Sequence, residues 1–322
     1  EVIVAPSIKD DTRGRSLHRS SNLDTQTGAG RNYTGKNIGV LCRDDGIVGP
    51  HIDFQGRIDN SMASGTGQTH GDGVSGIMAG AGNLDPSMRG MAAESNLYVA
   101  NYQANFLDSA TQTYINDGSV QITNSSYSNG CNDGYTTITQ TVDTQTNDIP
   151  SLLHVFSAGN SNNSNCGYGA GDQWGNITGG HKQGKNVIAT ANVFFDGSLV
   201  GSSSRGPAHD GRIKPDIAAN GQNQNSTDEN NTYQSFGGTS GAAPGIAGIS
   251  AQLYEAYGDL NGGDLPPSAL IKASLLNTAN EAGNIGPDYK FGWGIVNALR
   301  AGMLLEDSRY LSDDVSIYGI LE

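Results

Sequence analysis

The sequence predicts an α/β fold of three layers, in which helices cover both sides of a mostly parallel, doubly wound sheet. Short apolar runs recur along the chain, and segments with helical spacing lie between them. No internal repeat and no proline-rich linker interrupts this alternation. Strand and helix in alternation are typical of a parallel sheet.

Five runs are apolar on both faces, as expected for strands that are covered on both sides. They lie at 38–42, 97–100, 120–123, 152–158 and 187–191. Helical spacing occurs at 74–81, 135–146, 245–257 and 266–279. We expect right-handed crossovers between the strands and a site at their carboxyl ends.

The domain organisation follows from length and from the ends of the chain. A length of 322 residues allows one large domain or two small ones, and a single domain over about 1–305 is the simplest interpretation. Residues 1–36 are polar and irregular, so we expect them to wrap over the surface. The tail at 306–322 is interpreted as a trailing strand or as the start of a removed module.

Composition excludes some classes of protein. With 18 Lys and Arg against 32 Asp and Glu, the net charge is −14, which excludes a nucleic-acid binder built on a basic face. Apolar residues make up 35% and charged residues 16% of the chain, as in a globular protein. No apolar run is long enough to span a bilayer. The chain starts at Glu1, so we expect a processed form.

Three cysteines are too few for a disulfide scaffold and lack the spacing of a zinc site. Cys42 ends an apolar run and is predicted to be a buried thiol. Cys131 and Cys166 lie in polar loops. At most one disulfide can form, and we expect it to join these two.

Three segments place a reactive side chain beside glycines, at the end of a strand or the start of a helix. Asp44 and Asp45 precede Gly46 directly after the first apolar run. His70 begins the sequence His-Gly-Asp-Gly-Val-Ser-Gly, and Ser240 lies in Gly-Gly-Thr-Ser-Gly-Ala-Ala-Pro. Together these segments offer a carboxylate, an imidazole and a hydroxyl.

These groups fit nucleophilic catalysis. A serine hydroxyl becomes reactive when an imidazole takes its proton, and a buried carboxylate fixes the tautomer of that imidazole. Attack on an amide also creates an oxyanion, which needs preorganised donors. A serine at a helix start is usually only a cap. The agreement of three motifs favours a catalytic role for Ser240 instead.

The motifs resemble those of the subtilisin-like serine peptidases, the subtilases, over most of the chain. The order Asp44, His70, Ser240 is the order known for subtilisin, and Gly-Thr-Ser-x-Ala-x-Pro is the most specific piece. The resemblance implies a subtilisin-like fold and a secreted serine endopeptidase. In it Ser240 would attack, His70 would move the proton, and Asp44 would orient His70.

The same resemblance implies further site residues. Residues 157–160 are similar to the oxyanion segment of the family, so Asn160 would donate its side-chain amide to the oxyanion. Residues 124–128 resemble the extended segment that pairs with the substrate backbone. The substrate-binding residues implied in this way are Ser126, Tyr127, Ser128, Ala158 and Gly159.

The chain departs from the family pattern in two motifs. Gly241 follows the nucleophile where many relatives carry Met, and Asp72 and Gly73 replace the commoner Thr-His. Neither departure removes a catalytic group, so local packing and rate are affected and not the reaction type. Arg43 precedes Asp44, where a cation would favour the ionised carboxylate if it pointed that way.

Some expectations concern side chains beside the catalytic set. Asp45 is interpreted as a turn or cap residue. We expect an open first specificity pocket, the one for the substrate side chain next to the cleaved bond, that suits a large apolar side chain. The residues that favour it are Tyr127, Gly159 and 178–180. The remaining histidines are expected at the surface; they are His18, His51, His154, His181 and His209.

Other functions fit the sequence less well. The absence of Gly-x-Ser-x-Gly argues against an esterase or lipase, and that of His-Glu-x-x-His against a metallopeptidase. Acid-active serine-carboxyl peptidases share a similar nucleophile segment but replace the histidine by an acid, so His70 argues against them. A degenerate subtilase that only binds is the non-enzymatic alternative.

We expect no cofactor for catalysis. The Asp- and Asn-rich loop at 223–231 could hold structural calcium, but it lacks a calcium-binding spacing, so metal ligands stay open. The resemblance implies protein or peptide substrates, an inhibitory propeptide before maturation, a monomer and an extracellular location. It implies no nucleic acid and no membrane span.

Overall fold

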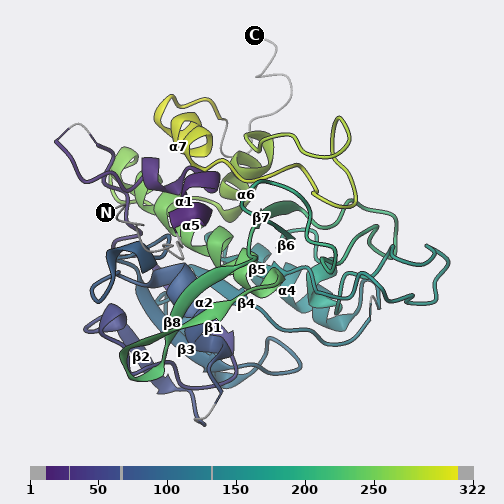
Figure 1. Ribbon diagram of the computed structural model, residues 1–322, viewed down its shortest axis with the longest axis horizontal. Coiled ribbons are helices and arrows are strands. Elements are labelled where there is room, and N and C mark those ends of the chain that lie inside the picture. Colours follow the sequence, from purple (N-terminus) through teal and green to yellow (C-terminus); the bar gives the residue numbers. More distant parts are fainter. Residues whose placement is uncertain (1–11, 29, 66–67, 132, 311–322) are drawn as a thin grey trace, which may run out of the picture.

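The fold is described from a computed structural model over residues 12–28, 30–65, 68–131 and 133–310. It confirms the predicted α/β class. Seven parallel strands form one sheet in the order β2-β3-β1-β4-β5-β6-β7 (Figure 1). Their bounds are β1 Gly39–Asp44, β2 Ile58–Met62, β3 Asn96–Asn101, β4 Ile122–Ser125, β5 Leu153–Ser157, β6 Ile188–Val193 and β7 Ile217–Asn220.

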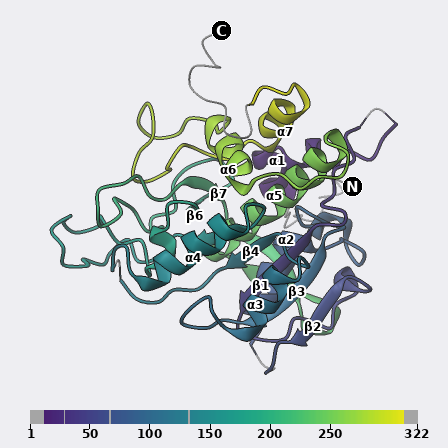
Figure 2. The same cartoon turned by 180° about the vertical axis from the view of Figure 1, so that it is seen from behind.

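Helices cover both faces of this sheet (Figure 2). Apolar side chains of α2 and α5 share one core with those of β1, while Leu41 of β1 meets Tyr114 of α3 on the other face. Val142 of α4 packs with Phe156 of β5 on that second face. The helices are α1 Thr12–His18, α2 His70–Ala79, α3 Ser109–Asn116, α4 Thr137–Asp148, α5 Thr239–Leu260, α6 Ser268–Asn277 and α7 Ala298–Glu306.

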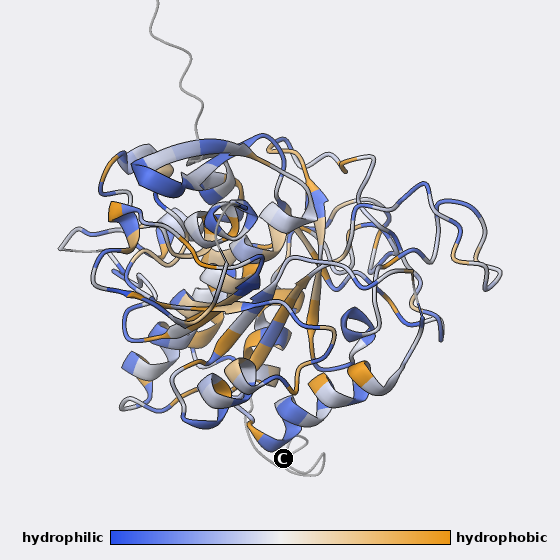
Figure 3. Ribbon diagram, turned by 90° about the horizontal axis from the view of Figure 1, so that it is seen from below, coloured by the Kyte–Doolittle hydropathy of each residue, from blue (hydrophilic) through white to orange (hydrophobic). Residues whose placement is uncertain are grey.

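The core lies along the central strands, which appear apolar in Figure 3 between more polar outer helices and loops. All six residues of β1 are buried, as are all five of β5. Cys42 is a buried free thiol in this core, as predicted. Strands that are buried on both faces require apolar side chains in both directions, which explains the continuous apolar runs.

Strand order sets the place of the site. β1 lies at the centre, β3 pairs with it on one side, and β4 pairs with it on the other. The order of the strands therefore reverses beside β1, and ligands of open parallel sheets bind at the carboxyl ends near such a point. Asp44 ends β1, Ser126 follows β4, and Ala158 follows β5.

Several elements were missing from the sequence expectations. The sheet gains β2 at one edge and β7 at the other, and a separate antiparallel hairpin is formed by β8 Gln224–Asp228 and β9 Thr232–Phe236. The N-terminal segment is also not wholly irregular, because α1 begins at Thr12. The trailing strand proposed for the tail lies outside the described residues.

The expectation of surface histidines was wrong at four positions. His18, His51, His154 and His181 are all buried. Burial lowers the pKa of His18 and of His154 to about 3, so both are neutral near pH 7. No helix within the described ranges is long and apolar enough to cross a membrane.

Candidate active site

Asp44 and His70 form the first contact of the site. Asp44 ends β1, and His70 is the first residue of α2. The Asp44 Oδ1 atom lies 2.7 Å from His70 Nδ1. Asp45 holds this pair in place, because its carboxylate accepts hydrogen bonds from the backbone N–H groups of His70 at 3.0 Å and Gly71 at 2.8 Å. Asp45 is therefore a helix cap, as predicted.

Burial and pairing act on the two side chains in different ways. The Asp44 side chain is 4% exposed and the His70 side chain 40% exposed. Burial raises the pKa of Asp44, and the hydrogen bond to His70 opposes that rise. Burial lowers the pKa of His70, but the hydrogen bond and charge of Asp44 outweigh it, so the pKa lies above its usual 6.5. Asp44 therefore stabilises the charged imidazole once His70 has taken up a proton.

Ser240 is the second residue of α5, which begins at Thr239 directly after Gly238. Its hydroxyl donates to the main-chain O of Ser126 at 3.0 Å, and the Ser126 hydroxyl donates to the main-chain O of Ser240 at 3.2 Å. No hydrogen bond joins Ser240 to His70 in the described part of the chain. The structure thus joins Asp44 to His70 and Ser240 to the segment after β4.

Asn160 lies against the same helix start. Its Oδ1 atom accepts hydrogen bonds from the Thr239 backbone N–H at 2.9 Å and from the Thr239 hydroxyl at 3.1 Å. Gly238 permits this approach: it has a φ of 90°, and a Cβ there would lie 3.1 Å from Asn160 Nδ2. Among the described residues, neither Asn160 Nδ2 nor the Ser240 N–H has a hydrogen-bond partner. Both donors are available to a ligand.

The two expected substrate-binding segments flank Ser240. Ser126 makes the reciprocal bonds described above, and Ser128 follows it on the same segment. On the other side, Ala158 and Gly159 are buried directly after β5, and the Gly159 N–H donates to the Thr239 hydroxyl at 3.2 Å. The main-chain O of Ala158 accepts from the Thr178 N–H at 3.0 Å.

Arg43 points away from Asp44 and toward the second face of the sheet. Its guanidinium donates to Asp108 Oδ2 at 2.8 Å and to the Tyr127 hydroxyl at 2.6 Å. It also lies 3.9 Å from the centre of the Phe106 ring. Successive side chains of a strand point to opposite faces, which separates Arg43 from its neighbour. The cation therefore fixes Tyr127 and leaves Asp44 unaffected.

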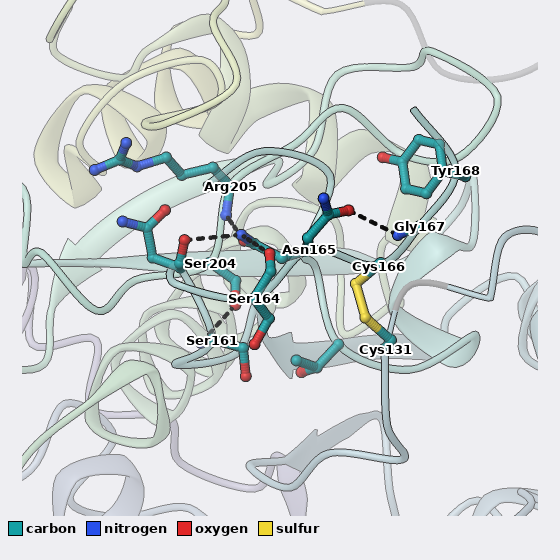
Figure 4. Close-up of a disulfide and its surroundings, with 12 residues drawn as sticks. Cys131, Ser161, Ser164, Asn165, Cys166, Gly167, Tyr168, Ser204 and Arg205 are labelled. Atoms are coloured by element: carbon teal, nitrogen blue, oxygen red, sulfur yellow. Dashed lines mark hydrogen bonds between the residues drawn. A yellow bond between two sulfur atoms is a disulfide. The ribbon is translucent and has the colours of Figure 1, made fainter. Parts of the chain in front are cut away.

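A disulfide joins the loops that follow the two substrate segments. Cys131 and Cys166 are bonded, as expected from the sequence (Figure 4). The main-chain O of Cys131 also accepts a hydrogen bond from the Gly179 N–H at 3.2 Å. The loop after residues 126–128 is thereby tied to the loop after Asn160 and to the segment at 178–180.

Packing explains the departures at Gly73 and Gly241. A Cβ at Gly73 would lie 2.3 Å from the Phe236 ring, which itself packs against the His70 ring with centroids 5.2 Å apart. A Cβ at Gly241 would lie 2.7 Å from the main-chain O of Gly221, so a longer side chain does not fit there. Phe236 was missed because no motif marks it.

A metal site finds no support in the described ranges. Within them, no group of three or more His, Cys, Asp or Glu side chains is placed to hold a metal ion. The loop at 223–231 instead forms most of the β8–β9 hairpin. The Ser226 hydroxyl of this hairpin donates to the main-chain O of Gly73 at 2.6 Å, which attaches it to α2.

Comparisons with known proteins agree with this geometry. The model of the subtilase family, Peptidase_S8, matches residues 35–294. The chain is 29% identical over 275 residues to subtilisin DY of Bacillus licheniformis, covering 82% of this chain and 90% of the relative. It is 28% identical over 280 residues to alkaline elastase YaB of Bacillus sp. (strain YaB), covering 83% of this chain and 65% of the relative.

A solved structure with low sequence identity supports the fold. The CspB protease of Clostridium perfringens superposes with a TM-score of 0.77 at 18% identity. The match covers 93% of this chain and 99% of that protein.

Proposed function

The chain belongs to the subtilase family of serine peptidases, and from this premise we propose that it is an endopeptidase that acts through an acyl-enzyme on Ser240. The main support is the 2.7 Å contact between Asp44, at the end of β1, and His70, at the start of α2, together with Ser240 as the second residue of α5. This arrangement supplies a base, a nucleophile and two unoccupied donors.

The proposed reaction starts with a change in the Ser240 side chain. Rotation about its Cα–Cβ bond frees the hydroxyl from Ser126 and directs it to the His70 ring. His70 takes the proton as Ser240 Oγ bonds to the substrate carbonyl carbon, while Asp44 stabilises the imidazolium. Hydrogen bonds at catalytic sites are often long in the absence of substrate and shorten in the complex.

The second half of the reaction uses the same groups. The oxyanion accepts hydrogen bonds from Asn160 Nδ2 and from the Ser240 N–H. The amide C–N bond breaks as His70 gives its proton to the leaving amine. Water then attacks the acyl-enzyme with His70 as base, and Ser240 regains its proton as the carboxylic acid leaves.

The remaining assignments rest on position and on family. We propose that Ser126 and Ser128 with Ala158 and Gly159 bind the substrate backbone on the two sides of Ser240, and that Tyr127 borders the first pocket. We also propose protein substrates, an inhibitory propeptide, a monomeric state, secretion, and catalysis without a cofactor. Family membership and the disulfide favour a location outside the reducing cytosol.

The Ser240→Ala substitution tests the proposal. Casein hydrolysis should fall by about four orders of magnitude or more, because the nucleophile is removed and only oxyanion and substrate binding remain. Labelling by a fluorophosphonate probe should be lost as well. Ser235→Ala, at an exposed position of β9, is the control and should retain both. Full activity of Ser240→Ala would remove Ser240 from the mechanism.

A further inference from the structure

The buried cations of the described chain differ in how their charge is compensated. Four Lys or Arg residues are less than a tenth exposed, and three of them pair with a carboxylate. Arg43 lies 2.8 Å from Asp108, and Lys214 lies 2.5 Å from Asp216. Arg15 contacts Asp24. Lys182 is the exception, because no ion pair within the described residues includes it.

Two hydroxyl groups hold the Lys182 amine. Its Nζ atom donates to Thr178 Oγ1 at 2.8 Å and more distantly to Ser157 Oγ at 3.5 Å. An ammonium group has three N–H donors, so one is left without a partner among the described residues. The side chain is fully buried, and burial lowers the pKa of Lys182 to about 7. A buried amine without an anion is costly to fold.

The groups around Lys182 supply no negative charge. Its neighbour His181 is fully buried, and both ring nitrogens of His181 lack a partner in the described part of the chain. The His181 ring packs on Phe156 at 4.8 Å and on Tyr127 at 5.7 Å between centroids. The carboxylate of Asp108, on the same face of the sheet, is already paired with Arg43. Among the described residues, an incoming anion would therefore be the first ion-pair partner of the Lys182 amine.

Lys182 lies directly behind the proposed substrate segment. Its partners Ser157 and Thr178 flank Ala158 and Gly159, the two residues assigned to substrate binding. A Cβ at Gly159 would lie 2.4 Å from Thr178 Oγ1, so the Thr178 hydroxyl lies close against the backbone of this glycine. The Lys182 amine lies on the Thr178 hydroxyl, to which it donates a hydrogen bond.

We propose that Lys182 determines specificity by binding an acidic side chain of the substrate, at the residue on the amino side of the cleaved bond. The proposal rests on the proposed peptidase function and names its substrate class. A Glu or Asp carboxylate that enters beside Gly159 accepts the free N–H of Lys182 and supplies the missing countercharge. The expectation of a large apolar side chain in this pocket is replaced by this proposal.

Matched peptides test the preference directly. A fluorogenic series that differs only in this residue, with Glu, Gln, Leu or Ala, should give a kcat/KM for Glu at least about 10-fold above that for Gln. Lys182→Met should reduce the Glu-to-Gln ratio to about 1 and raise cleavage after Leu. Lys185→Met, three residues away and exposed, should leave the ratio unchanged.

Two further measurements keep the outcomes separable. Thr178→Val removes the hydroxyl that holds the Lys182 amine, so it should also lower the Glu-to-Gln ratio of kcat/KM. This variant serves as the test if Lys182→Met does not fold. In the Ser240→Ala protein, a peptide that ends in Glu should bind about 10-fold more tightly than one that ends in Gln. Such binding without any hydrolysis by the parent enzyme would refute the proposed function and support the Lys182 assignment.

A wild-type Glu-to-Gln ratio near 1 overturns the assignment. So does a high ratio that persists in both variants. Cleavage confined to the Ala peptide would show that the Lys182 side chain fills the pocket, and it would also overturn the proposal while leaving the peptidase function in place.

Discussion

Asp72 illustrates how burial alters a single side chain beside the site. It is 2% exposed and follows His70 by two residues on α2. Burial raises the pKa of Asp72 to about 7; Asp228 and Asp45 add to the rise, and a hydrogen bond from the Gly49 N–H at 2.6 Å opposes it. Its charge therefore changes within the neutral range, unlike that of an ordinary carboxylate.

The Asp72→Asn substitution should stabilise the protein at high pH. The folded state keeps a proton on Asp72 up to about pH 7, whereas the unfolded chain releases it near 3.8. Stability is therefore lost as the pH rises between these values. Asn keeps the acceptor oxygen and removes the charge, so unfolding by urea should cost about 1–3 kcal/mol more at pH 8 and be little changed at pH 4.

Asp133 provides the control for this experiment, since its side chain is exposed. Asp133→Asn should shift the free energy of unfolding by less than about 0.5 kcal/mol at either pH. An Asp72→Asn protein that is equally stable or less stable than the wild type at pH 8 would contradict the electrostatic explanation.

Single residues were predictable from the sequence where a motif fixed their context. The contact of Asp44 with His70, and the capping role of Asp45, follow from motifs that end a strand and begin a helix. The buried histidines did not follow, because a lone histidine carries no such context. The burial of His154 could have been predicted, because this residue lies inside the apolar run at 152–158, which predicts an interior strand.

At the scale of elements, α5 shows why a helix can contain several glycines. Gly241, Gly245 and Gly248 each disfavour a helix interior relative to alanine. A Cβ at Gly248 would lie 2.6 Å from the Cβ of Met91 and 2.7 Å from the main-chain O of Met78. Close packing against the end of α2 therefore requires the glycine. The same packing holds the start of α5, with Ser240, beside the strand ends.

The substitutions Gly248→Ala and Gly258→Ala should act in opposite directions. Alanine gains about 1 kcal/mol in helix propensity at either position, but the added methyl group overpacks the core at Gly248. A Cβ at Gly258 meets nothing closer than 3.6 Å. We expect Gly248→Ala to lose about 1–2 kcal/mol and Gly258→Ala to gain up to about 1 kcal/mol in urea unfolding. Equal effects would rule out close packing as the reason.

Element boundaries were predictable where apolar runs were long. The expected strand at 152–158 corresponds to β5, the helical spacing at 245–257 lies within α5, and the helix start expected at Ser240 is confirmed to within one residue. The edge strand β2 is Ile-Asp-Asn-Ser-Met and only partly buried, so it has no continuous apolar signal. The polar hairpin β8–β9 was interpreted as a loop for the same reason.

At the scale of the whole molecule, the folded protein keeps the large negative net charge of its sequence. The formal charge of −14 leaves an excess of acidic groups that repel one another at neutral pH. The sequence predicted the sheet and its general topology from the alternation of strands and helices. It could not predict the packing behind the substrate segment, because Lys182 gains its environment only when residues 157 and 178 meet.

Salt should therefore stabilise the protein at neutral pH. Raising NaCl from about 20 to about 200 mM at pH 7.5 shortens the Debye length and screens the repulsion, so Tm should rise. The isoelectric pH is about 4.7, and the same change of salt near that pH should have little effect. A Tm that is independent of salt at pH 7.5, or that rises equally at both pH values, would contradict a role for net charge.

The reciprocal hydrogen bonds between Ser126 and Ser240 have a consequence for the resting enzyme. In the absence of substrate, the hydroxyl of the proposed nucleophile donates its hydrogen bond to the substrate-pairing segment and not to His70. Arrival of a peptide chain along that segment would compete for the same oxygen and release the hydroxyl. The hydroxyl would then be free to turn toward His70 only while a substrate occupies the segment.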